Sequence, residues 1–199
     1  FMQPYMGLGN SLQTAQGGAG GGGGGAAGGW VELGRTTLGS ALDDITVSSL
    51  ADKRYYMVLC NNLATGSTGE RIRLGNGSID TGSNYANRAS KAGGAEITST
   101  SETSYDINEG LTPNTPTFDV TYISNLATKE KLMINHWVYQ NNAGAGTAPY
   151  RIESVGKWTN TSNPLDYFNK TNVEAGSFNT GSEAVVLGWD PADTHTTNF

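Results

Sequence analysis

Residues 178–190 read Phe-Asn-Thr-Gly-Ser-Glu-Ala-Val-Val-Leu-Gly-Trp-Asp, and this stretch decides the fold class. The Asn-Thr-Gly-Ser segment is typical of a turn, and four consecutive apolar residues, 184–187, follow it closely. A short apolar run between glycines predicts a β-strand that is covered on both faces. Strands late in the chain cannot supply all of that cover. We therefore expect partner strands from the first half of the chain and one sheet system for the whole globular part.

Further strand candidates recur along the chain, separated by segments rich in Gly, Asn, Ser and Thr. They are residues 30–38, 45–48, 54–60, 70–75, 84–89, 96–100, 104–108, 118–123, 132–139 and 150–158, followed by a run at 165–173. The nearest competitor for a helix, residues 41–50, contains β-branched residues at its centre. No crossover helices separate the strands, so antiparallel pairing is expected. The sequence predicts an all-β fold, an antiparallel β-sandwich of about ten short strands.

Several local features refine this prediction. Residues 54–60 are apolar or aromatic on both sides and should form a central strand. Phe118, Val120 and Tyr122 should share one side of a core strand that pairs with residues 132–139. Asn76-Gly77 is typical of a tight hairpin turn. We expect the small-residue loop at 141–149 to lie at one end of the sandwich.

The first 29 residues differ from the rest. Residues 1–16 are apolar with little charge, and residues 17–29 are nearly all glycine, which predicts a flexible linker when the segment is left alone. We divide the chain into an apolar arm and glycine-rich linker, 1–29, and a β-sandwich domain, 30–199. The extended arm either packs on its own domain or docks on a neighbouring subunit, and both interpretations stay open at this point.

Composition argues against several classes of partner. Charged residues make up 15% of the chain, below the roughly 25% typical of soluble domains, and the formal net charge is −6. Binding of nucleic acid through a basic face is therefore not expected. No stretch approaches the ~20 apolar residues of a membrane-spanning helix, so no membrane insertion is expected. The single cysteine, Cys60, lies in an apolar run and is expected to be a buried thiol.

Few residues suggest a metal or cofactor site. His136 lies within a predicted strand, where a structural role is expected. Asp190, Asp193 and His195 could offer three ligands, but calcium loops carry denser oxygen ligands and zinc sites need a fourth nitrogen or sulfur ligand. The other interpretation is a surface turn set by Pro191. We therefore expect no metal and no cofactor.

The sequence also lacks a recognisable catalytic constellation. No Gly-x-Ser-x-Gly motif occurs, and a serine nucleophile needs a positioned histidine and carboxylate. Glu153, Glu174 and Glu183 leave a carboxylate pair for glycoside hydrolysis open, but no feature selects a pair. We expect no catalytic residues and no enzyme activity.

Aromatic residues are frequent, and aromatic rings serve both as sugar-stacking platforms and as core or interface anchors. The residues concerned are Tyr55, Tyr56, Tyr85, Tyr105, Trp137, Tyr139, Tyr150, Trp158, Tyr167 and Trp189. The second role is the expected one for most of them.

The closing segment resembles a known group of proteins. Residues 176–188, Gly-Ser-Phe-Asn-Thr-Gly-Ser-Glu-Ala-Val-Val-Leu-Gly, resemble the final strand of phage-type virion surface proteins, in which a Gly-x-Phe-x-x-Gly-Ser turn feeds an apolar strand. Other blocks look like segments of largely uncharacterised proteins common among marine viral sequences. These blocks are residues 30–38, 80–85, 127–132, 144–149, 156–161 and 188–195. The resemblance covers residues 30–199 and implies a jelly-roll-like virion component with a low-complexity arm. It carries over no catalytic residues.

Three hypotheses about function follow. The first is a surface-exposed viral structural protein, a capsid decoration or a head or tail fibre, that assembles with itself as a trimer or lattice, contacts other virion proteins and attaches to a host glycan in some settings. A jelly-roll capsid shell protein is a variant of it. The second is a carbohydrate-binding or adhesive β-sandwich module. The third is a hydrolase on a jelly-roll scaffold.

Overall fold

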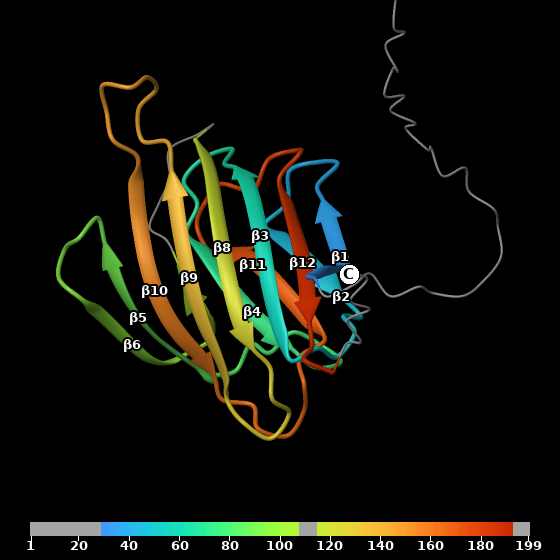
Figure 1. Ribbon diagram of the computed structural model, residues 1–199. Helices are drawn as coiled ribbons and strands as arrows, with labels where there is room; N and C mark the ends of the chain where they lie inside the picture. Colours follow the sequence, from blue (N-terminus) through green and yellow to red (C-terminus); the bar gives the residue numbers. More distant parts are fainter. Residues whose placement is uncertain (1–28, 108–114, 193–199) are drawn as a thin grey trace, which may run out of the picture.

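The computed structural model describes residues 29–107 and 115–192, which form twelve β-strands in two sheets packed face to face (Figure 1). The strands are β1 (Val31–Thr37), β2 (Asp44–Ser48), β3 (Tyr55–Leu63), β4 (Glu70–Gly75), β5 (Tyr85–Lys91), β6 (Ile97–Glu102), β7 (Tyr105–Asp106), β8 (Pro116–Ser124), β9 (Lys131–Tyr139), β10 (Tyr150–Trp158), β11 (Tyr167–Asn172) and β12 (Glu183–Trp189). The predicted antiparallel β-sandwich is confirmed, with twelve strands where about ten were expected. The predicted arm falls mostly on residues 1–28, outside the described residues, and the jelly-roll-like character stays a prediction.

One sheet is twice as wide as the other. The large sheet has the order β1-β12-β3-β8-β9-β10-β5-β6, and the small sheet has the order β2-β11-β4-β7. Every strand pair within both sheets is antiparallel. Within the described residues no helix is long and apolar enough to cross a membrane.

The strand that decided the fold class, β12, lies between β1 and β3. Its partners from the first half of the chain are therefore confirmed. Its expected cover on both faces is wrong. Ala184 and Val186 are buried against the small sheet, whereas Val185 and Leu187 point the other way and stay half-exposed. The reason is that the small sheet covers only one side of the large one.

The core between the sheets is built from the inward side of each strand. Tyr56 and Val58 of β3, Ile72 and Leu74 of β4, and Phe168 of β11 are all fully buried there. The predicted central strand at 54–60 is confirmed, because β3 has a strand on each side in the large sheet.

The structure changes one of the two expected connections and agrees with the other. A tight turn does follow β4, with Gly77 at φ +70° and an antiparallel bridge between Gly75 and Ile79. It does not form a hairpin with the next strand, because β4 belongs to the small sheet and β5 to the large one. The loop at 141–149 joins β9 to β10 and projects at one end of the sandwich, at the top of Figure 1, as expected.

Gly156 of β10 marks a close approach of the two sheets. A Cβ atom placed there would lie 2.3 Å from the ring of Tyr105 and 2.9 Å from the carbonyl oxygen of Ala86. Tyr105 belongs to the small sheet and shares a 2.7 Å hydrogen bond with Ser154, so its ring has little freedom to move.

We expect Gly156→Ala to lower the free energy of unfolding by about 1–3 kcal/mol, because an extra methyl group overpacks this contact. Gly146→Ala is the matched control, since a Cβ atom there meets nothing within 4 Å, and its effect should stay within about 0.5 kcal/mol. Urea denaturation of both variants measures the difference. Equal stability of the two variants would contradict this packing.

Candidate functional site on the outer face of the large sheet

Strand β8 is unusual because its apolar side faces solvent. Thr117, Asp119 and Thr121 alternate on the buried side, whereas Phe118 and Tyr122 on the other side are 46% and 47% exposed. The expectation that Phe118, Val120 and Tyr122 share one side is confirmed. Their assignment to a core strand is wrong for that side, because the small sheet packs on the threonine and aspartate side.

The same apolar surface continues over the neighbouring strands. We define the outer apolar face by its side chains on five adjacent strands of the large sheet: Val185, Leu187 and Trp189 of β12; Tyr55, Met57 and Leu59 of β3; Phe118, Val120 and Tyr122 of β8; Leu132, Ile134 and Val138 of β9; and Val155 of β10. Strands about 4.8 Å apart with about eight residues at about 3.3 Å each give this side of the five strands an area of roughly 600 Å², which includes the exposed His136 and Glu153 as well as the apolar side chains. The largest apolar patch on a typical monomer covers about 300–600 Å².

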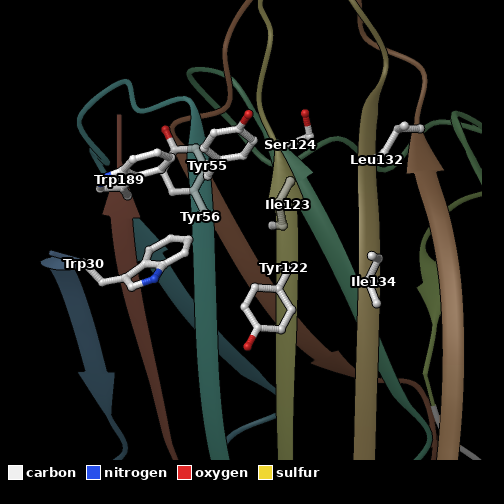
Figure 2. Close-up of a pocket in the computed structure, with 9 residues that line it drawn as sticks. All are labelled: Trp30, Tyr55, Tyr56, Tyr122, Ile123, Ser124, Leu132, Ile134 and Trp189. Atoms are coloured by element: carbon white, nitrogen blue, oxygen red, sulfur yellow. The ribbon is translucent and has the colours of Figure 1, made fainter. Parts of the chain in front are cut away.

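A pocket with a volume of about 500 Å³ opens at one end of this face. Figure 2 shows Trp30 and Trp189 on one side of it, with Tyr122 and Ile134 across from them. The rings of Tyr55 and Trp189 are stacked, with centroids 5.5 Å apart and an interplanar angle of 17°. No charged side chain is among the described residues that line it.

His136 points outward from β9 within the face, and charged side chains lie on β10 and beyond it. A second hollow of about 460 Å³ lies between Ile134, Val155 and the strands β5 and β6. On that side Lys157 forms a 2.8 Å ion pair with Glu130, and Arg88 pairs with Glu96. An apolar centre bordered by paired charges is the usual plan of a protein–protein interface.

His136 does not line this pocket. His136 points outward from β9 and is exposed, opposite Val120 and Glu153 on the adjacent strands. Asp193 and His195 lie outside the described residues. Asp190 accepts backbone hydrogen bonds from Arg54 (3.1 Å) and Ala192 (2.8 Å), so it stabilises a turn around Pro191.

The three glutamates left open for hydrolysis have separate partners. Glu153 lies 3.6 Å from Arg151, Glu183 lies 3.6 Å from Arg35, and Glu174 accepts a hydrogen bond from the Ser67 hydroxyl. Across the described part of the chain no group of three His, Cys, Asp or Glu side chains could hold a metal ion. Cys60 is fully buried as expected, and burial raises the pKa of its thiol.

Sequence reasoning missed several residues of this site. Leu132, Ile134 and Val155 are each about half-exposed, but an apolar residue in a strand is ordinarily assigned to the core. The sequence pattern assigns Trp30 only to the start of a strand and gives it no role in a site. The alternation of Thr and Asp against Phe, Val and Tyr in residues 117–122 was the available signal.

Comparison with known proteins gives no relative: no family model, no curated protein and no solved structure matches this chain.

Two adjacent residues of β9 test which side is outward. Met133 is 1% exposed and Ile134 is 51% exposed. We expect Met133→Ala to lower the free energy of unfolding by about 2–5 kcal/mol and Ile134→Ala to lower it by less than about 1 kcal/mol. Chemical denaturation at low protein concentration gives both values. A larger loss for Ile134→Ala would show that the strand is turned over.

Proposed function

We propose that this protein is a structural protein of a virion surface, a capsid decoration or a head or tail fibre, that assembles with copies of itself through the outer apolar face. The observation that carries the proposal is that the solvent side of β8 is more apolar than its buried side. Moving Phe, Val and Tyr side chains out of water lowers the free energy by about 25 cal/mol per Å² of apolar area buried. A surface of this kind is expected to be covered in the working state of the protein.

A second copy of the same chain fits this face best. A specific interface buries about 800 Å² on each partner, and the outer side of these five strands, roughly 600 Å², supplies most of such an area. The face carries few charges that a different partner would need to complement. Two sheets that meet face to face about a two-fold axis also bring the same residues of both copies together, as in most homo-oligomers.

The aromatic pocket supplies anchors for such a contact. Trp30, Tyr55, Tyr122 and Trp189 come from four strands or their ends and gather at one end of the face. Tryptophan and tyrosine are the residues that most often dominate binding energy at interfaces. The contact should therefore be centred near this end.

The virion part of the proposal is supported by the low fraction of charged residues and by the resemblance of residues 30–199 to phage-type and marine viral proteins. The loop at 141–149 projects from one end of the sandwich, where it is open to a host surface or to other virion proteins. A role as a jelly-roll shell protein is the variant of this proposal in which the same contact builds the capsid itself.

A carbohydrate-binding module is the second candidate, and the stacked pair of Tyr55 and Trp189 is the observation that favours it. Sugar sites combine aromatic platforms with directed hydrogen-bonding groups. Polar side-chain groups in this pocket are few, mainly the hydroxyls of Tyr55, Tyr122 and Ser124. The arrangement therefore favours protein contact over sugar binding.

Assembly is tested by one charge placed in the middle of the face. We expect the native chain to sediment as a homo-oligomer and Ile134→Glu to sediment as a monomer. Its dissociation constant should rise by at least roughly 100-fold, because the interface would bury an unpaired carboxylate. Analytical ultracentrifugation over a range of concentrations provides the measurement.

Ser48→Glu is the matched control, since Ser48 is exposed on β2 of the small sheet, and it should assemble like the native chain. A native chain that stays monomeric at all concentrations would overturn the assembly proposal. Gold-labelled antibodies to the 141–149 loop should decorate intact particles of a virus that carries this sequence. Unlabelled particles would overturn the surface location, and binding on a glycan array by a monomer would favour the second candidate.

A further inference from the structure

Three ionisable side chains meet in the centre of the sandwich. They are Lys170 of β11 and Asp119 of β8, both 0% exposed, and Glu70 of β4, which is 1% exposed. The amine nitrogen of Lys170 lies 2.7 Å from Oε2 of Glu70 and also contacts Oδ2 of Asp119. A charge is costly to remove from water, so a fully buried group of three needs a physical or chemical reason.

The lysine and the aspartate belong to opposite sheets. Asp119 lies in the large sheet, with Cys60 and Trp137 at the paired positions on the adjacent strands. Lys170 lies in the small sheet, with Ile45 and Ile72 at its paired positions. The amine and the carboxyl group therefore face each other across the core between the two sheets.

Neighbouring groups hold the carboxyl groups in defined orientations. Asn135 donates a hydrogen bond to Oδ1 of Asp119 (3.3 Å), which leaves Oδ2 for the lysine. Trp137 donates to Oε2 of Glu70 (3.1 Å), and Thr117 donates to its Oε1 (3.4 Å). The Lys170 amine thus contacts Oδ2 of Asp119 with the Glu70 carboxylate fixed beside it.

The raised pKa of Asp119 favours the carboxylic acid that the reaction needs, whereas the raised pKa of Lys170 opposes the neutral amine. Burial, together with the charge of Glu70, raises the pKa of Asp119 to about 6 despite the nearby Lys170. Burial lowers the pKa of Lys170, but the two carboxylates raise it by more, so the amine keeps its proton against loss to solvent. Movement of that proton to Asp119 needs no exchange with solvent. It converts an ion pair into a neutral amine and a carboxylic acid, which a dry interior favours relative to water.

We propose that Lys170 and Asp119 join through an intramolecular isopeptide bond, with Glu70 as the proton carrier. The neutral Lys170 amine attacks Cγ of Asp119, a C–N bond forms, and the carbonyl electron pair moves to Oδ1, where Asn135 donates. Glu70 takes a proton from the nitrogen and passes it to the Oδ2 hydroxyl. The C–Oδ2 bond then breaks, water leaves, and Oδ1 becomes the amide carbonyl.

The balance is one carboxylic acid and one amine giving one amide and one water, with no oxidant and no cofactor. Glu70 ends in the carboxylate form in which it began. The product replaces a buried ion pair by a neutral amide that links the two sheets covalently. This inference does not depend on what covers the outer apolar face.

Intact mass spectrometry of the full chain, unfolded and reduced, tests the proposal. The expected mass is lower than the mass of the unmodified chain by one water molecule. After trypsin digestion, residues 92–129 and 158–199 should appear as one branched peptide, without cleavage at Lys170. A full unmodified mass, or a water loss located elsewhere such as a cyclised Asp or Asn, would overturn the proposal.

Glu70→Gln removes the proton carrier and leaves the reacting pair, Lys170 and Asp119, unchanged. It keeps the size of the side chain, and we expect the full mass and three separate tryptic peptides, residues 92–129, 158–170 and 171–199. Glu130→Gln, at a half-exposed carboxylate outside the cluster, is the matched control and should retain the water loss. A Glu70→Gln protein that still carries the bond would overturn the role of Glu70. The intact mass of the native chain shows whether the bond exists, even if the Glu70→Gln variant does not fold.

Discussion

The two-residue period of β8 ties the centre of the molecule to its surface. Because side chains alternate strictly along a strand, Asp119 can face the core only if Phe118 and Val120 face away from it. Lys170 lowers the free-energy cost of turning Asp119 toward the core, since it supplies a positive charge within reach of Asp119 and Glu70. Without that amine, two carboxylates would lie unpaired in the core, and the opposite orientation of the strand would be preferred. The buried cluster and the outer apolar face are two results of one constraint.

This coupling gives the proposed function a physical basis. A sandwich that places polar groups inside and large apolar groups outside forgoes part of the hydrophobic stabilisation a single subunit could gain. In the proposed assembly, association would recover that free energy at the outer face, and the proposed covalent link between the sheets would limit the conformational entropy of the unfolded chain. Both features would be useful to a structural protein of the kind we propose.

The strands could be predicted well from sequence, because alternation and turn residues are local signals. β3, β9, β10 and β12 all lie where the pattern of residues 54–60, 132–139, 150–158 and 184–187 indicates them. Which side of each strand faces the core could not be predicted in the same way. Alternation sorts Phe118 from Asp119 but does not say which one faces the core, and the usual preference for buried aromatics gave the wrong answer. The deciding partner, Lys170, lies far along the chain in the other sheet. For the same reason the turn at Asn76-Gly77 was recognised but the change of sheet after it was not.

Val31 at the start of β1 pairs with Gly188 near the end of β12, so the chain enters and leaves the sandwich side by side. A mechanical load applied through these two points would peel β1 from β12 one hydrogen bond at a time rather than shear all of them together. The edge strand β1 would then detach first, at low force, before the load reaches the interior around Lys170. A chain pulled through these two points would therefore lengthen by the residues of β1 before the interior strands separate.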